Sequence, residues 1–307
     1  MSQRRRTELE QYSAIIKSTP SSQKEKKKGL RQLENKAQSW YTLDNQEYQK
    51  ARKNRDDFVQ QSLKNYLHAL QACDDFNSSV VRFFALWLEN ADSPSANEAV
   101  QHAIHQVPSW KFVGLTNQLT SRLLDDGSDF QKGLSALVIR MCVDHPYHMT
   151  HTIYAGASSA VGTGDEIGAS RKRAATKIRD FLGSHKDVSE LFKRIWQSCR
   201  YYVSLAHAKV NAPARNQKIF VQDVKVANDV DKAVRKLSVP PATLNLDLRP
   251  SADYYDIPLI TRFRSEIKIA GGLSAPKILT AMATDGKEYK QLVIRTMSFT
   301  FLTLTVS

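Results

Sequence analysis

The 307-residue sequence lacks the features that mark secreted, membrane-spanning and metal-binding proteins. It has three cysteines, and none of them is spaced as in a C-x-x-C motif. No apolar run approaches the roughly 20 residues of a membrane span, and the opening MSQRRRTELEQYS lacks the apolar stretch of a secretory signal. We therefore expect no membrane partner and a reducing compartment with free, mostly buried thiols. The cysteines are Cys73, Cys142 and Cys199.

Acidic residues are scarce relative to basic ones, and two segments carry most of the imbalance in the net charge of +13. Residues 1–65 hold 15 basic and 8 acidic side chains, a net of +7, and residues 171–236 hold 16 and 6, a net of +10. The segment between residues 66 and 170 has a net charge of −6. The basic segments could make weak contact with nucleic acid or attract an acidic protein surface, although solvated helix faces are the simpler explanation.

Apolar residues recur every three or four positions from about residue 23 to residue 237, as in amphipathic helices. Breaks divide this pattern into helices of about 12 to 20 residues, each too short to bury its apolar face alone. Such helices commonly stack as antiparallel pairs in a superhelical scaffold. We therefore predict a mainly α fold, an antiparallel helical-repeat solenoid, with a compact helical bundle as the alternative.

Several side chains in the helical region resemble site residues, but we expect structural roles for them. His145, His148 and His151 cannot all share one helix face, because residues six apart lie about 240° apart around a helix. Packing or capping is the expected role of these histidines, and no metal site is predicted. Ser109 follows Pro108 and is expected to cap the next helix. The four tryptophans are expected to pack in the core: Trp40, Trp87, Trp110 and Trp196.

The pattern changes after residue 237. Residues 238–256 are rich in proline, which favours extended backbone, and form a predicted linker. The segment TRFRSEIKIA then alternates polar and apolar residues, as a half-buried strand does. Two further apolar segments flank Asp285-Gly286, expected to be a two-residue hairpin turn because both positions tolerate positive φ. A short β-hairpin segment is thus predicted within residues 257–293.

The turn AGGLSAPK, between the first two of these strands, is the candidate for ligand binding. It matches neither G-x-x-x-x-G-K-[ST] nor G-x-G-x-x-G, and paired glycines between strands often form an ordinary turn. In a phosphate site, the glycines would let backbone N–H groups approach the ligand and the lysine would add positive charge. The candidate residues are Gly271, Gly272, Ser274, Pro276 and Lys277.

Four blocks of the sequence resemble, in the same order, the ATM/Tel family of phosphoinositide-3-kinase-related protein kinases. RFFALWLENAD, QVPSWKFVGLTNQLTSRL and LVIRMCVDHPYHMTHTIYAGAS are similar to the C-terminal part of the family's FAT helical domain. IKIAGGLSAPKILTAMATDGKEYKQLV is similar to the start of its kinase domain. The resemblance implies a FAT-like helical repeat region at residues 1–237, the linker at 238–256, the start of a kinase N-lobe at 257–293 and a tail unlike the family at 294–307.

The resemblance also implies an activity for the complete parent protein. Kinases of this family use ATP with Mg or Mn and phosphorylate protein substrates at Ser or Thr followed by Gln. They act in the nucleus in DNA double-strand-break signalling and telomere maintenance, and a break-sensing complex recruits them. We expect the parent to be a homodimer whose remaining kinase domain completes the site. In the family, the turn matched by residues 271–277 covers the ATP phosphates.

The sequence departs from the family after Val293. The family places a phosphate-binding lysine at the next position, where this chain has Ile294 followed by RTMSFTFLTLTVS. The family's catalytic and metal-binding residues have no counterpart here, so we expect a fragment that holds no catalytic residue and does not turn over. The alternative is a non-catalytic helical-repeat scaffold that binds an acidic protein or nucleic acid.

We therefore expect this chain alone to hold neither ATP nor a divalent metal tightly. Transcript sequence across the codons for Val293 and Ile294 separates the two alternatives. An open frame that resumes with lysine supports the kinase fragment, and a stop in every transcript supports the scaffold.

Overall fold

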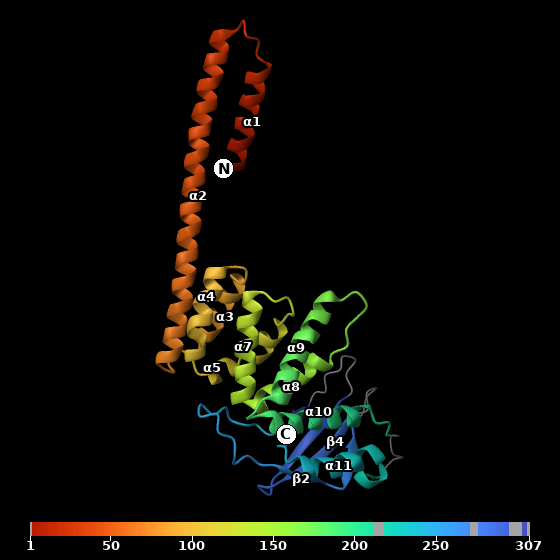
Figure 1. The fold of residues 1–307 in the computed structure, drawn as a ribbon. Helices are drawn as coiled ribbons and strands as arrows, with labels where there is room; N and C mark the ends of the chain where they lie inside the picture. The colour runs from red at the N-terminus through yellow and green to blue at the C-terminus, as the bar shows by residue number, and fades with distance from the viewer. Residues whose placement is uncertain (1, 211–217, 271–275, 295–302, 306–307) are drawn as a thin grey trace. The chain divides into compact units, whose positions relative to one another are not determined.

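The structure is a computed structural model that describes residues 2–210, 218–270, 276–294 and 303–305, with helices preceding a small antiparallel sheet (Figure 1). This arrangement confirms the fold class predicted from the sequence. The chain divides into two units, residues 1–65 and 66–307, and each is described by itself. Within the described residues, no helix is both long enough and apolar enough to cross a membrane.

The first unit contains α1 (Ser2–Ser18) and most of α2 (Lys24–Ala72). Its side chains interact mainly at the surface: Arg5 pairs with Asp44 at 2.6 Å, and its guanidinium lies 5.3 Å from the ring centre of Trp40. Trp40 is 45% exposed, so the prediction that it packs in the core is wrong. Two helices alone offer too few neighbours to enclose an indole ring.

The second unit begins with the end of α2 and continues as a series of helices around an aromatic core. Trp87 is fully buried beside Phe83 and Phe130, and its indole N–H donates to Asn97 Oδ1 at 2.9 Å. The helices are α3 (Ser79–Glu89), α4 (Pro94–Ala103), η1 (Ile104–Gln106), α5 (Trp110–Val113), α6 (Thr116–Ser121), α7 (Asp129–Asp144), α8 (Pro146–Ser158), α9 (Glu166–Ser184) and α10 (Ser189–His207).

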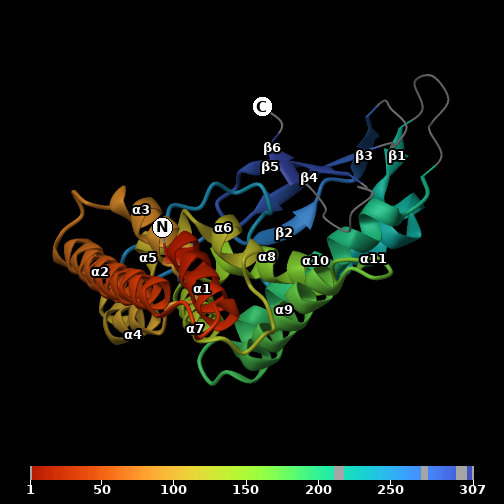
Figure 2. The same ribbon diagram turned by 90° about the horizontal axis from the view of Figure 1, so that it is seen from above.

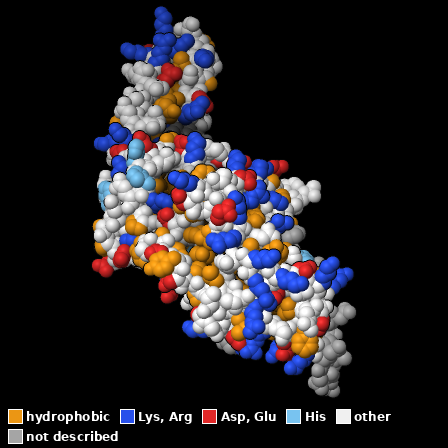
Figure 3. All heavy atoms as spheres, turned by 60° about the horizontal axis from the view of Figure 1, so that its bottom comes forward, with side chains coloured by type: hydrophobic (Ala, Val, Ile, Leu, Met, Phe, Trp, Pro, Cys, Tyr) orange, Lys and Arg blue, Asp and Glu red, His pale blue; other side chains and the backbone are white. Residues whose placement is uncertain are grey.

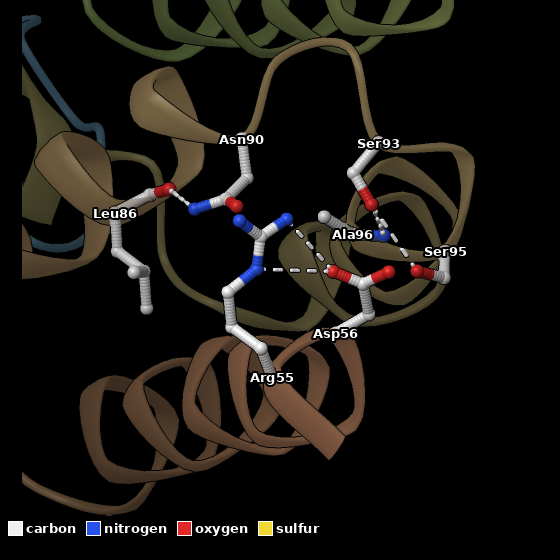
Figure 4. Close-up of polar contacts among 7 residues, drawn as sticks. All are labelled: Arg55, Asp56, Leu86, Asn90, Ser93, Ser95 and Ala96. Atoms are coloured by element: carbon white, nitrogen blue, oxygen red, sulfur yellow. Dashed lines mark hydrogen bonds and ion pairs between the residues drawn. The ribbon is translucent and has the colours of Figure 1, made fainter. Parts of the chain in front are cut away.

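Local polar contacts begin and end these helices. Figure 4 shows Asn90, after α3, donating its side-chain amide to the carbonyl of Leu86 at 2.8 Å. The hydroxyl of Ser93 accepts from the N–H of Ala96 at the start of α4, where Pro94 needs no hydrogen-bond acceptor. Ser93 and Pro94 therefore begin α4 with an ordinary helix cap.

One predicted cap is wrong. We expected a single helix after Pro108, capped by Ser109, but the structure has the two short helices α5 and α6 there. Ser109 has αR backbone and makes no capping bond. Its hydroxyl donates instead to Asp144 Oδ2 at 2.5 Å, because α7 brings a carboxylate within reach.

The thiols are free, as predicted, and two of the three are buried. Burial raises the pKa of Cys142 and of Cys199 to about 12, since a thiolate loses its hydration in the core. These two side chains therefore act as small apolar residues. Cys73 is half-buried after the end of α2.

A small antiparallel sheet follows the helices, and α11 lies between its first two strands in the sequence. Its order is β1-β3-β4-β5-β6, with β2 also paired to β4, and every pair is antiparallel. The elements are β1 (Ile219–Phe220), η2 (Val221–Asp223), α11 (Lys225–Leu237), β2 (Ile260–Phe263), β3 (Glu266–Ile269), β4 (Lys277–Ala283), β5 (Glu288–Val293) and β6 (Thr303–Thr305).

The sequence predicted one continuous strand in TRFRSEIKIA, and the structure corrects this to two. β2 and β3 both pair with β4 and are separated at Arg264 and Ser265. At the break, the carbonyl of Ser265 accepts from the N–H of Val221 at 2.7 Å, while the N–H of Arg264 donates to Thr280. The contact with Val221, remote in sequence, draws the chain out of the regular ladder.

The hairpin between β4 and β5 forms as predicted, but with a different turn. Its loop has three residues, because the N–H of Gly286 bonds to the carbonyl of Ala283 and the N–H of Ala283 bonds to the carbonyl of Lys287. Gly286 has φ +77°, whereas Asp285 is not among the positive-φ residues. This is the turn-plus-bulge geometry of a three-residue hairpin, which needs positive φ at the glycine alone.

One face of the sheet packs against α10 and α11, which lie beside the strands in both views (Figure 1, Figure 2). Val230 and Val234 of α11 share this core with Phe263, Leu279 and Ala281 of the sheet. Residues 219–237, which the sequence pattern grouped with the helical region, thus pack with the strands of the kinase-like segment.

Candidate nucleotide-binding site

The predicted site residues lie at the turn between β3 and β4. Gly271, Gly272 and Ser274 fall outside the described residues, so the structure leaves their roles as predictions. The base of the turn is described: the N–H of Ala270 donates to the carbonyl of Pro276 at 2.8 Å. This bond brings the ends of β3 and β4 together on either side of the candidate segment.

Lys277 opens β4 and points into the core between the sheet and α10. Its side chain is only 4% exposed, and its ammonium donates to the carbonyl of Ala206, 3.1 Å away in the last turn of α10. Carbonyls in a last helical turn have no partner within the helix, so a buried ammonium is a favourable donor to them. In this arrangement Lys277 attaches the sheet to α10, and its contact with a nucleotide stays a prediction.

Strand register places the family's lysine position on the other face of the sheet. Lys277 is the partner of Val293 in the β4–β5 pair, and Ile294 follows Val293 directly. Because successive side chains in extended backbone alternate, Ile294 lies on the face opposite to Lys277. A charge at residue 277 in this conformation therefore cannot replace one at residue 294.

The face that carries Ile294 is more exposed than the face that carries Lys277, and it holds both apolar and charged side chains. Ile278 and Met282 from β4 and Leu292 from β5 share it, by the same alternation. Lys268, the partner of Ile278, and Lys290, the partner of Thr280, lie on this face as well, but Ile294 itself offers no charge at the family's lysine position. Within the described residues, no group of three or more His, Cys, Asp or Glu could hold a metal ion.

Two buried polar contacts join the helices to the sheet. The hydroxyl of Tyr202 on α10 donates to Gln291 Oε1 on β5 at 2.7 Å, and burial raises the pKa of this tyrosine. Asp231 on α11 accepts the N–H of Phe263 at 2.7 Å through one oxygen and pairs with Arg235 through the other. Sequence reasoning missed these residues, because nothing in a helical periodicity distinguishes them from other positions on a half-buried face.

A directed chain of hydrogen bonds attaches the predicted linker to the helices. The N–H of Arg249 donates to the hydroxyl of Tyr254, whose own proton reaches His145 Nδ1 at 2.8 Å. His145 then carries its proton on Nε2, 3.2 Å from Ser109 Oγ, and Ser109 donates to Asp144. Between the Arg249 donor and the Asp144 acceptor, Tyr254, His145 and Ser109 each donate one hydrogen bond and accept one, which is the arrangement of a neutral His145.

The surroundings of His145 favour that neutral form. Its pKa is lowered to about 4, chiefly by burial, with Asp144 raising it and His148 lowering it further. His148 Nε2 lies 3.1 Å from the carbonyl of Leu246, a second contact to the same extended segment. These two histidines have packing and hydrogen-bonding roles, and residues 238–256 are packed on α8 rather than suspended between units of structure.

Comparison with known proteins finds protein kinases. The chain is 38% identical over 260 residues to the serine/threonine-protein kinase TEL1 of Gibberella zeae, covering 84% of this chain and 9% of that protein. It is 37% identical over 290 residues to the serine/threonine-protein kinase tel1 of Emericella nidulans, covering 94% of this chain and 10% of that protein. No protein-family model matches the sequence.

Solved structures agree with the sequence comparison. The FAT and kinase domain of CtTel1 matches 94% of this chain and 20% of that chain, with 37% identity and a TM-score of 0.79. The complete CtTel1 dimer with C2 symmetry matches 94% of this chain and 10% of that chain, with 37% identity and a TM-score of 0.78. The chain thus spans about a tenth of the curated relatives it matches. By this homology it belongs to the ATM/Tel serine/threonine-protein kinases, and it corresponds to the FAT helices and the start of the kinase N-lobe.

Proposed function

We propose that this chain is the junction between the FAT helices and the kinase domain of an ATM/Tel-type kinase. The observation that carries the proposal is the core shared by α10, α11 and the sheet. Buried polar contacts cross that core, between Tyr202 and Gln291 and between Lys277 and Ala206. A junction of this kind holds the N-lobe strands in a defined orientation on the helices, which a phosphotransfer site needs because its catalysis depends on positioning.

The complete kinase, in this proposal, transfers phosphate from ATP with Mg or Mn to Ser or Thr followed by Gln. The turn at residues 271–277 forms the roof over the phosphates, and the rest of the kinase domain supplies the charged groups. The parent acts in the nucleus, in DNA double-strand-break signalling and telomere maintenance, and a break-sensing complex recruits it. The C2 dimer of the related CtTel1 supports a homodimeric parent.

A chimeric kinase tests this proposal. Residues 35–293 of this chain replace the matching segment of CtTel1, and the purified protein is given ATP, magnesium and a peptide with Ser-Gln. We expect phosphorylation of this peptide and much less of a matched Ser-Ala peptide. A folded, dimeric chimera that is inactive beside active CtTel1 would contradict the proposal.

A second candidate is a scaffold that binds an acidic protein or nucleic acid. Lys and Arg side chains are spread over the face drawn in Figure 3, with Asp and Glu between them. Exposed basic residues of α9, α10 and α11 contribute to the net charge of +10 in residues 171–236. Contacts with DNA phosphates would weaken steeply as salt rises, because bound counterions are released. The test measures the affinity of the chain for labelled duplex DNA at low and at moderate salt. Equal affinity at both salt concentrations would exclude binding to nucleic acid through its phosphates.

A further inference from the structure

A polar groove lies between α11 and β2, beside the contact of Asp231 with the sheet. Its volume is about 540 Å³, and three arginines from two parts of the fold line it. Arg235 lies on α11 and Arg262 on β2, and Arg264 follows the last residue of β2. All three are exposed, and residues 262 and 264 lie on one side of the extended chain, as alternation requires.

The carboxylates in the groove are already engaged by other groups. Asp231 is buried and accepts a backbone N–H through one oxygen and Arg235 through the other. Glu266 lies 3.7 Å from the ammonium of Lys218. The side chain of Arg262 has no hydrogen-bond or ion-pair partner within the described residues. Of the three arginines, Arg235 and Arg264 are paired with carboxylates, and the Arg262 side chain alone is left without an acidic partner within the described residues.

The two paired arginines keep further N–H groups for a ligand. Arg264 uses Nε and one terminal nitrogen for Glu288, and Arg235 uses one terminal nitrogen for Asp231. A guanidinium carries N–H groups on all three nitrogens in a planar fork that matches phosphate oxygens. The existing ion pairs orient these two side chains, which lowers the entropy lost when a ligand binds.

We propose that this groove binds a phosphate monoester carried on a peptide, a phosphorylated Ser or Thr side chain. The volume exceeds that of a lone phosphate and lies in the usual range of ligand sites. Val221 and Met282 offer apolar walls, and the amides of Gln222 and Asn228 offer donors and acceptors for a peptide backbone. This binding function goes beyond the proposed phosphotransfer and does not depend on it.

Fluorescence anisotropy with the full chain tests the proposal. The probe is a labelled peptide with one phosphoserine flanked by alanines, beside its unphosphorylated counterpart. We expect the phosphorylated probe to bind more tightly, and Arg262→Gln to weaken its binding by roughly tenfold, the loss of one charge-assisted contact to phosphate. Arg82→Gln removes the same charge from an exposed position on α3 and is the matched control. It should leave binding unchanged.

Competition identifies the recognised group. Free O-phosphoserine in excess should displace the probe, and it should bind more weakly than the phosphopeptide. The proposal would be overturned if the phosphorylated and unphosphorylated peptides bound with equal affinity. It would also be overturned if the Arg262 and Arg82 variants lost the same affinity for the phosphorylated peptide, because either result indicates non-specific attraction. Equal affinity of free phosphoserine and phosphopeptide would overturn the peptide assignment. Matching circular dichroism spectra of the variants establish that both are folded.

Discussion

Lys111 is a buried charged residue that joins α5 to the end of α2. Its ammonium donates to the carbonyls of Leu70 and Cys73 at 2.6 and 2.8 Å and lies 2.9 Å from Asp74. The lysine side chain is 2% exposed. The carbonyl of Leu70 lies in the last turn of α2 and that of Cys73 follows it directly, where carbonyls lack partners within the helix.

We expect Lys111→Met to lower the free energy of unfolding by about 2–3 kcal/mol, because the substitution leaves buried carbonyls without a donor. Urea denaturation followed by circular dichroism measures the change. Lys132→Met, at an exposed position on α7, is the control and should change stability by less than about 0.5 kcal/mol. A loss at residue 111 no larger than the control's would show that water replaces the ammonium.

His145 is a second single residue that affects stability, because its protonation makes the free energy of unfolding depend on pH. Its pKa is lowered to about 4 by burial, whereas an unfolded histidine titrates near 6.5. Between these values the unfolded chain binds the proton more strongly, so this contribution to stability is complete above pH 6.5 and is lost as the pH falls toward 4.

We expect the loss over this interval to approach about 3 kcal/mol for the single group. The measurement compares the free energy of unfolding at pH 7 and near pH 4 for the wild type and His145→Asn, and the variant should depend less on pH. His102→Asn alters an exposed histidine and should follow the wild type. Parallel curves for the wild type and the His145 variant would contradict a buried neutral imidazole.

At the scale of elements, the β4–β5 hairpin depends on one backbone conformation. Gly286 has φ +77°, a region that costs residues with a Cβ about 1 kcal/mol. We therefore expect Gly286→Ala to lower the free energy of unfolding by about that amount. Gly114→Ala is the matched control, because Gly114 has φ −60° and no atom within 4 Å of an added Cβ. Equal effects of the two changes in urea denaturation would argue against the turn described above.

The contact of α10 with β5 gives a second expectation at this scale. Tyr202→Phe removes the donor to Gln291 Oε1, and Gln291 Nε2 already lacks a partner within the described residues. We expect a loss of about 1–3 kcal/mol from the single change. Adding Gln291→Leu should recover much of the loss, since the double change also removes the buried amide that would lack a donor. Additive losses in the double variant would show that the two residues are not coupled.

At the scale of the whole molecule, we expect the chain alone to transfer no phosphate and to hold ATP weakly. Ile294 has no charge where the family places its lysine, and Lys277 is engaged by α10 on the other face. The assay combines the purified chain, radiolabelled ATP, magnesium or manganese and a Ser-Gln peptide. Label transfer above a buffer control, abolished by changes within residues 271–277, would show that the chain carries a working site.

Much of the fold was predictable because its signals are local. Apolar spacing identified most of the helices, but neither α1 nor the 49-residue length of α2. The Asp285-Gly286 pair identified the hairpin. The order of the family blocks identified the FAT helices and the N-lobe strands, and the comparisons confirm the resemblance. The turn type, the break between β2 and β3 and the role of Ser109 were not predictable, because each is decided by a partner elsewhere in the fold.

The sequence by itself determined the succession from helices to strands and which family the chain belongs to, since both follow from the order and spacing of residues. Tertiary structure alone decided where the buried polar groups find partners. Lys277 meets a carbonyl 71 residues away, and Tyr254 meets His145 at a separation of 109. A buried polar group must be paired wherever the packing of apolar faces places it, so its partner depends on the assembled core.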